Sequence, residues 1–328
     1  MFKKLIYSIF LLCFLALAFV AYQFFAKPLL KNPPAVSIII QPGTGLNAIA
    51  QQLHHDGLMP YPTLFIAWAL LNHQERLLKA GEYEIDTSMT AAQFLNNMVA
   101  GKVILHKVTF IEGWTFQDMR QALDQNPFLT HTITKVDDKE LMKSLGSKLK
   151  SPEGLFFPET YTFTRGDKDT QVLQESYKRM QDMLNFQWEQ RAPNLPYPGS
   201  YQALIVASMI EKEAASSPDR VQISGVILRR LKKGMRLQID DTLFYGLHQP
   251  QTYHLTKADL QKDTPYNTYL HYALPPTPIC MPSEESIYAA LHPDSGDSLY
   301  YVARGDGGSE FSSTYEKHQK AVAQFIIK

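Results

Sequence analysis

Two glutamates stand close together in the segment 201–214, which is otherwise mostly small or apolar and reads YQALIVASMIEKEA. The spacing of its apolar residues predicts a helix. Glu211 then shares a face with Ala207 and Ser208, whereas Glu213 points about 200° away around the helix. Because burial disfavours a charged carboxylate, a glutamate on such a face is expected to have a raised pKa and to act as a general acid. The alternative is a glutamate that pairs with a lysine or arginine at the helix edge.

Polar and apolar residues alternate just downstream, over 235–240. This period of two predicts a half-buried strand that carries Arg236, Gln238 and Asp240 on one face. Three polar side chains in a row either line a sugar-binding cleft or face water, and the pattern alone does not separate the two.

A rigid loop is predicted over 266–279, which reads YNTYLHYALPPTPI. Its prolines restrict the backbone, and aromatic residues flank them. Loops of this kind on a scaffold often position ligands, and tight packing against the core explains the same pattern equally well.

Composition and missing motifs exclude several other functions. The chain has 32 basic and 32 acidic residues, whereas nucleic-acid-binding proteins normally carry a basic excess. Two cysteines cannot form a disulfide scaffold or a cysteine-rich zinc module. The sequence contains neither G-x-S-x-G nor H-E-x-x-H, so it predicts no serine nucleophile elbow, no metal site and no cofactor. The glycines of 305–308 lack the Lys-Ser/Thr of a phosphate loop and predict a hairpin turn.

A membrane anchor is predicted at the N-terminus. Residues 5–25 carry no charge, and 21 helical residues are roughly 32 Å long, which matches a hydrocarbon core of roughly 30 Å. Lys3 and Lys4 precede the span, so the tail 1–4 is expected in the cytoplasm and the rest of the chain outside it. A cleaved signal peptide is the alternative. Because Cys13 would lie in the span, it cannot pair with Cys280.

The remaining chain predicts an α+β fold. Residues 26–34 form a short linker, residues 35–103 read β-α-α-β-α, and residues 104–328 mix both element types. Thr90 and Ser217 are the expected helix caps. The predicted strands are 35–40, 80–85, 102–111 and 235–240, and the predicted helices include 46–57, 62–71, 90–99, 169–191, 201–214 and 217–234.

Several short motifs occur together in one order along the chain. They are ASMIEKE at 207–213, GMRLQ at 234–238, YNTY at 266–269 and LPP at 274–276, preceded by Glu153-Gly154, Pro158 and Thr160-Tyr161. This ordered set closely resembles the MltG/YceG-like endolytic murein transglycosylases, and the resemblance covers nearly the whole chain. It implies a LysM-like subdomain at 35–103 and a catalytic transglycosylase domain at 104–328.

The resemblance implies a lyase that cleaves the β-1,4 bond between N-acetylmuramic acid and N-acetylglucosamine within nascent glycan strands. Such enzymes leave 1,6-anhydro-muramic ends, because the C6 hydroxyl of the sugar replaces water as the nucleophile. One carboxylate then suffices, where ordinary glycosidases need two. The catalytic glutamate of the family falls on Glu211. Positions expected in the cleft, with Asp240 and Asn267 orienting the sugar or stabilising oxocarbenium character, are Arg236, Gln238, Asp240, Tyr266 and Asn267.

The same resemblance implies a single-pass protein of the bacterial inner membrane, with its bulk in the periplasm. It implies peptidoglycan as substrate and penicillin-binding proteins or other synthesis machinery as partners. Departures from the family pattern affect the predicted cleft loops: Asp241 replaces Pro, Ala273 and Thr277 replace Gly, Met281 replaces Asn, and Ser309 replaces His. Two alternatives follow: a membrane-anchored peptidoglycan-binding scaffold with little catalysis, and a hydrolase that leaves reducing muramic ends.

Overall fold

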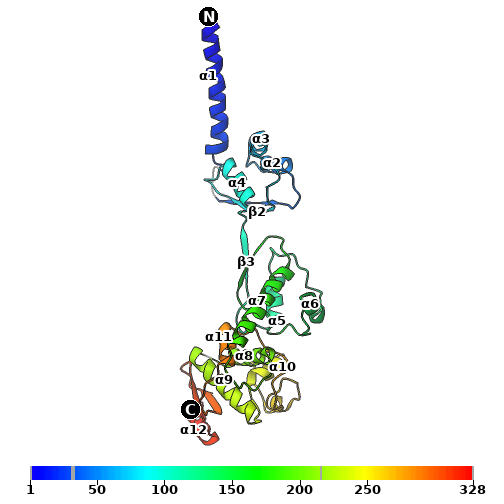
Figure 1. The fold of residues 1–328 in the computed structure, drawn as a ribbon, viewed down its shortest axis with the longest axis vertical. Helices are drawn as coiled ribbons and strands as arrows, with labels where there is room; N and C mark the ends of the chain where they lie inside the picture. Colours follow the sequence, from blue (N-terminus) through cyan, green and yellow to red (C-terminus); the bar gives the residue numbers. More distant parts are fainter. Residues whose placement is uncertain (1, 31–33, 215, 327–328) are drawn as a thin grey trace. The chain divides into compact units, whose positions relative to one another are not determined.

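The structure is a computed structural model that describes residues 2–30, 34–214 and 216–326. Part of the predicted linker, 31–33, lies outside the described residues. The chain divides into two compact units (Figure 1). Unit 1 comprises Met1–His106 and Thr162–Asp167, and unit 2 comprises Lys107–Tyr161 and Lys168–Lys328.

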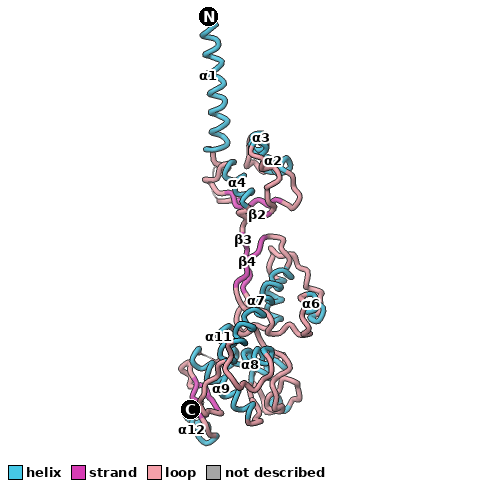
Figure 2. The backbone as a smooth tube through the Cα atoms, viewed as in Figure 1, coloured by secondary structure: helices cyan, strands magenta, loops and turns pink. Residues whose placement is uncertain are grey.

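Helices and short strands alternate along the chain (Figure 2), which gives the mixed α+β fold that the sequence predicts. The strands are β1 Val36–Ile40, β2 Gly81–Ile85, β3 Leu105–Thr109, β4 Thr160–Thr164, β5 Tyr300–Ala303 and β6 Ser309–Ser312. The helices are α1 Phe2–Ala21, α2 Leu46–His55, α3 Pro62–Leu71, α4 Ala91–Ala100, α5 Phe116–Asp124, α6 Asp138–Ser144, α7 Asp169–Glu189, α8 Ser200–Glu213, α9 Ser217–Lys232, α10 Asp240–Gly246, α11 Glu284–Leu291 and α12 Tyr315–Phe325. A π-helical turn, Tyr22–Ala26, and a 3-10 turn, Asp259–Gln261, complete the described elements.

Unit 1 begins with an apolar helix and continues as a small α+β body. Within the described residues, Lys3–Ala26 is the one helical stretch long and apolar enough to cross a membrane. Strands β1 and β2 pair in antiparallel register, with Ile38 opposite Tyr83. The predicted Thr90 cap of α4 is confirmed, and it forms a capping box: Thr90 accepts from the backbone of Gln93, and the side chain of Gln93 accepts from the backbone of Thr90.

Unit 2 is built around α8, which packs against α7, α9, α10 and α11. All residues from Ala203 to Ile210 are buried, so α8 is apolar on every side and runs through the core. The last turn leaves the core, and there the sequence changes to charged residues at 211–213. The fold thereby places two glutamates and a lysine at the edge of the core on a rigid support.

Two local predictions are wrong, and one hairpin is confirmed. Residues 235–239 alternate in burial, but they form no strand. Gln238 takes a left-handed conformation (φ 54°), which interrupts a strand ladder, and Asp240 already begins α10. The N-cap of α9 is Ser216 rather than Ser217, and its side chain makes no capping bond. The glycine-rich turn at 305–308 does join β5 to β6.

Candidate active site

Glu211 lies in the last turn of α8 with both carboxylate oxygens engaged. Its Oε2 accepts hydrogen bonds from the backbone N–H of Ser283 (2.9 Å) and from the Ser283 hydroxyl (2.5 Å). Arg220 of α9 places Nη2 3.5 Å from Oε1. The side chain is only 7% exposed. Glu211 is therefore a nearly buried carboxyl group whose orientation is set by two neighbours from other elements.

The segment that carries Ser283 is fastened to α8 at Ser208. The Ser208 hydroxyl accepts from the N–H of Ile279 (3.0 Å), and the Ser208 carbonyl accepts from the Cys280 thiol (3.3 Å). Ser283 then caps α11 by accepting from the N–H of Ser286 (3.2 Å). Its hydroxyl thus joins the start of α11 to Glu211.

A second loop approaches from the start of unit 2. Gly113 donates its N–H to the carbonyl of Met281 (2.8 Å), and Met281 donates to the carbonyl of Trp114 (2.7 Å). Gly113 has φ of 78°, and a Cβ placed there would lie 4.0 Å from Cγ of Glu211. Burial and the nearby charge of Glu211 raise the pKa of the preceding residue, Glu112. Glu211 is therefore enclosed by α8, the 279–283 segment and the Gly113 loop.

Glu213 occupies a different environment two residues further on. Burial, reinforced by the charge of Asp241, raises its pKa to about 8. The Tyr301 hydroxyl donates to its Oε2 (2.9 Å) and partly opposes that rise. At neutral pH Glu213 is therefore mainly a neutral carboxylic acid.

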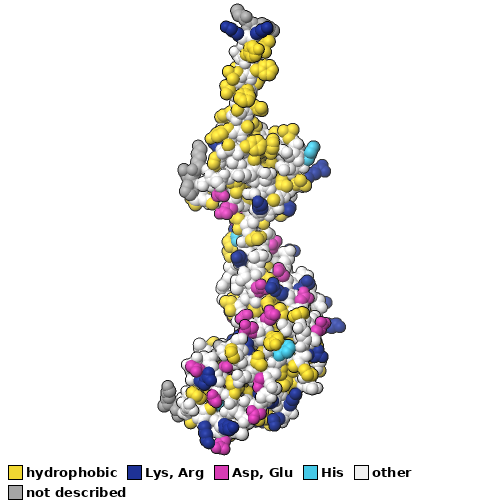
Figure 3. Space-filling view, turned by 60° about the vertical axis from the view of Figure 1, so that its left-hand side comes forward, with side chains coloured by type: hydrophobic (Ala, Val, Ile, Leu, Met, Phe, Trp, Pro, Cys, Tyr) yellow, Lys and Arg dark blue, Asp and Glu magenta, His cyan; other side chains and the backbone are white. Residues whose placement is uncertain are grey.

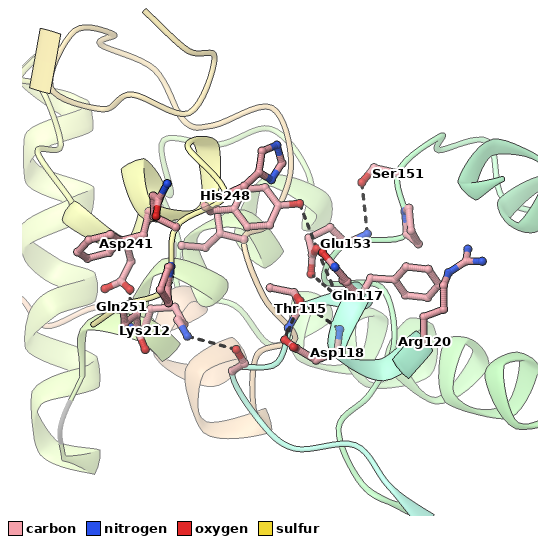
Figure 4. Close-up of a pocket in the computed structure, with 18 of the residues that line it drawn as sticks. Thr115, Gln117, Asp118, Arg120, Ser151, Glu153, Lys212, Asp241, His248 and Gln251 are labelled. Atoms are coloured by element: carbon pink, nitrogen blue, oxygen red, sulfur yellow. Dashed lines mark hydrogen bonds between the residues drawn. The ribbon is translucent and has the colours of Figure 1, made fainter. Parts of the chain in front are cut away.

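A cleft of about 690 Å³ opens beside this end of α8 (Figure 4). Lys212 and Asp241 reach it from one side, and Thr115, Asp118 and Glu153 from the other. The residues that line it are Gly113, Thr115, Phe116, Gln117, Asp118, Arg120, Asp138, Ser151, Pro152, Glu153, Lys212, Asp241, Phe244, Tyr245, His248, Gln249, Pro250, Gln251 and Ile279. This lining is rich in hydrogen-bond donors and acceptors, as a carbohydrate ligand requires. One lining residue, Lys212, directly follows Glu211 in the sequence.

Glu153 is the most deeply buried acid of the cleft, at 5% exposure. It accepts hydrogen bonds from the N–H of Phe116 (3.0 Å) and from the Tyr245 hydroxyl (3.0 Å). Burial raises its pKa to about 7 against the opposing effect of the Tyr245 bond. The next residue is Gly154, with φ of 75°, where a Cβ would overlap the ring of Pro278.

None of the five predicted substrate-binding residues belongs to the cleft lining, and three of them contact the loop 268–272 instead. Asp240 accepts a hydrogen bond from the Tyr269 hydroxyl (2.5 Å). Arg236 holds its guanidinium 4.7 Å from the centre of the Tyr272 ring. Gln238 has an exposed side chain, and its backbone N–H donates to the carbonyl of Thr268. The structure therefore brings these residues together with the aromatic loop rather than with Glu211.

The two predicted loop residues, Tyr266 and Asn267, have different surroundings. The ring of Tyr266 meets that of Tyr245 edge-on at 4.8 Å, so it borders the cleft through Tyr245. Asn267 is wholly buried. Its amide donates to the carbonyls of Leu260 (3.2 Å) and Lys262 (2.7 Å) and accepts from a backbone N–H. Asn267 thus holds the loop in shape.

Four polar residues near Glu211 were not among the predicted site residues: Glu112, Lys212, Arg220 and Ser283. Two of them could have been predicted from the nearby sequence. Lys212 lies between the two glutamates, and Ser283 precedes Glu284 and Glu285, as a helix N-cap does. Arg220 and Glu112 carried no signal of their own. Among the described residues, no group of three or more His, Cys, Asp or Glu side chains could hold a metal ion.

Comparison with known proteins gives a consistent result. Residues 38–324 match the model of the YceG-like family. An endolytic murein transglycosylase of Bacillus subtilis (strain 168) is 30% identical, over 89% of this chain and 85% of the relative. An endolytic murein transglycosylase of Streptococcus pneumoniae (strain R6) is 25% identical over 96% of this chain, which spans 64% of that longer protein.

One solved structure is similar to this chain in both fold and sequence. The crystal structure of a yceG-like protein from Listeria monocytogenes aligns with a TM-score of 0.55 and 30% identity. The alignment covers 88% of this chain and 99% of the Listeria chain. With the family match spanning most of its length and a relative at 30% identity, this chain belongs to the YceG-like family.

Proposed function

We propose that this chain is an endolytic murein transglycosylase, a lyase that cuts peptidoglycan within its glycan strands, and that Glu211 is its catalytic residue. The family membership and the names of the Bacillus and Streptococcus relatives support the activity. The single observation that supports Glu211 is its position: a nearly buried carboxyl group, oriented by Ser283 and Arg220, at the end of α8 beside a polar cleft.

In the proposed reaction, Glu211 first donates its proton to O4 of N-acetylglucosamine as the bond from C1 of N-acetylmuramic acid breaks. The resulting carboxylate then accepts the proton of the muramic C6 hydroxyl, whose oxygen forms the new bond to C1. The products are a free 4-hydroxyl and a 1,6-anhydro-muramic end, and Glu211 regains its proton. Arg220 and the two Ser283 donors stabilise the carboxylate between these steps.

The neighbouring residues receive complementary roles. The cleft lined by Lys212, Gln249 and Gln251 binds the glycan through hydrogen bonds to its hydroxyl and amide groups. Arg236, Gln238, Asp240 and Tyr266 bind sugars beyond the cleft, which suits a substrate that continues in both directions. Asn267 acts indirectly, because its buried amide shapes the loop that presents Tyr266.

We further propose that α1 anchors the chain in the inner membrane with its N-terminus in the cytoplasm, as Lys3 and Lys4 indicate. Residues 104–328 then carry catalysis outside the cytoplasm. Residues 35–103 act as a LysM-like subdomain that binds glycan. This placement brings the enzyme to strands as penicillin-binding proteins polymerise them, where a cut terminates elongation.

The decisive experiment incubates the full chain in detergent with purified, uncrosslinked glycan strands and identifies the new ends by mass spectrometry. We expect 1,6-anhydro-muramic ends inside the strands with the wild type and roughly 10²- to 10⁴-fold slower formation with Glu211→Gln, whose amide cannot donate the proton. Reducing muramic ends would instead identify a hydrolase. Strand binding without cleavage would identify the scaffold alternative.

A further inference from the structure

Helix α3 exposes an apolar face in unit 1. The segment 61–71, YPTLFIAWALL, contains no charged residue. Phe65 and Ala69 are buried in the core, while Leu71 is 75% exposed, Leu70 50% and Tyr61 43%. A short helix that is apolar on both its buried and its exposed side does not match a water-facing surface.

This face is continuous with the candidate membrane span. Phe19 of α1 meets Tyr61 edge-on, with ring centres 6.4 Å apart. Below it, Trp68 packs against Phe24 at 5.7 Å and Phe25 at 4.8 Å. Figure 1 shows α3 level with the C-terminal end of α1, and Figure 3 shows hydrophobic side chains continuing from α1 onto the adjoining body of unit 1.

The contact at Phe19 sets the depth of α3. Phe19 precedes the end of the span at Ala26 by seven residues, which at 1.5 Å per residue is about 10 Å along the helix. A ring in contact with Phe19 therefore lies inside the level at which the span meets the headgroups. Tyr61 and Trp68 are the residue types that gather at a membrane–water interface.

The rim of this face suits a lipid surface. Exposed Arg76 follows α3, and Lys27 follows the span. Basic residues at the border of an apolar face are attracted to anionic lipid headgroups. The apolar face and its basic rim are thus arranged in the order that a bilayer presents from its interior outwards.

We propose that the exposed face of α3 is immersed in the lipid leaflet at the C-terminal end of α1, so that unit 1 rests on the bilayer. The inference relies on the proposed anchoring by α1. Anchoring by the span alone does not require α3 to contact lipid. The proposed contact would hold one face of the body 35–103 against the membrane.

Spin-label accessibility in the full chain tests this inference. The protein is reconstituted in vesicles of phosphatidylethanolamine and phosphatidylglycerol, with a nitroxide at one cysteine at a time. Leu71→Cys reports on α3, and Glu84→Cys is the control, since Glu84 is exposed on β2 at the other side of unit 1 (Figure 1). Both carry Cys13→Ala, while Cys280 is wholly buried and does not react. Native Cys13, exposed on α1, reports separately on the span.

We expect the label at position 71 to collide more often with oxygen and less often with a water-soluble nickel chelate than the label at position 84. Equal exposure of both labels to the chelate would overturn the proposal. Protection of position 71 from both quenchers would overturn it too, because that pattern marks a protein contact with a second copy or a partner helix. A label at Cys13 accessible to the chelate would instead refute the anchoring itself.

Discussion

Ser283 donates both its backbone N–H and its hydroxyl to one oxygen, Oε2 of Glu211, across 72 positions of sequence. The same hydroxyl caps α11 by accepting from Ser286. The orientation of the proposed catalytic carboxyl group therefore depends on where α11 begins. The other oxygen, Oε1, faces Nη2 of Arg220 at the longer distance of 3.5 Å.

Replacing Ser283 by Ala should lower kcat more than it raises KM. A hydrogen bond to a charged group contributes about 1.5–3 kcal/mol, so loss of the hydroxyl should slow turnover roughly 10- to 100-fold. The lost cap should also reduce the free energy of unfolding by about 1 kcal/mol. Ser283→Thr keeps the hydroxyl and is the matched control. Unchanged kcat in Ser283→Ala would show that the hydroxyl does not act on the reaction, whatever its effect on folding.

The two glutamates of α8 should respond in opposite ways to the same substitution. Glu211→Gln should reduce the formation of anhydro ends by roughly 10²- to 10⁴-fold, the usual contribution of general acid–base catalysis. Glu213→Gln should retain activity near neutral pH, because Glu213 is mainly protonated there and glutamine resembles the neutral acid. The converse result would move the catalytic assignment to Glu213.

Stability should fall with rising pH because of Glu213. Its pKa is about 8 in the folded chain against 4.5 ordinarily, so between these values the folded state holds more protons than the unfolded state. The contribution is fully present below pH 4.5 and is lost as pH rises through about 8. The slope approaches about 1.4 kcal/mol per pH unit. Denaturant unfolding across this window should give a flatter profile for Glu213→Gln. The remaining slope reports on the other carboxyl groups whose pKa burial raises, which are Glu153, at about 7, Glu112 and Asp241. Identical slopes would refute the assignment.

The ion pair of Glu82 in unit 1 should have the opposite pH dependence: its contribution to stability should be lost in acid. Glu82 is buried, and Arg165, with His106, lowers its pKa to about 2. This stabilisation is present above pH 4.5 and is lost as pH falls toward 2. Arg165→Met should cost unit 1 about 1–3 kcal/mol, because it removes donors from a buried carboxylate. Hydrogen exchange of the β2 amides measures this loss of stability. The double variant Glu82→Gln/Arg165→Met, which also removes the buried charge, is the control. Unaltered exchange in the single variant would contradict the prediction.

Local patterns predicted the helices well, and the reason is visible in particular elements. The apolar spacing of α2 and α8, the Thr90 cap of α4 and the glycines that end helices all act within a few residues. Residues 235–239 show where this fails. Their alternation correctly indicates burial of Leu237 and Ile239, but a strand also needs a partner, and the left-handed Gln238 prevents one.

The candidate site shows the same difference between features set by nearby residues and features set by distant ones. The near-burial of Glu211 could be predicted from its helix face, because Ala207 and Ser208 lie one turn away. Its partner Ser283 comes from a distant segment, and no local pattern specifies that contact. Glu213 was expected on the opposite side of α8, but its burial depends on Tyr301 of the β5–β6 hairpin. Burial of a charged residue is a tertiary property, and so is the pKa that follows from it.

The positive φ of Gly154 and its close approach to Pro278 have a consequence for the orientation of Glu211. Glu153 precedes this glycine, and the chain from Pro278 to Ser283 leads to Glu211, so one backbone contact connects the two acids. A side chain at position 154 would push Pro278 away and move Ser283 with it. The absence of a side chain at position 154 thus leaves room for the segment that orients Glu211. A larger residue at position 154 would therefore disturb the orientation of the Glu211 carboxyl group without replacing any group that contacts it.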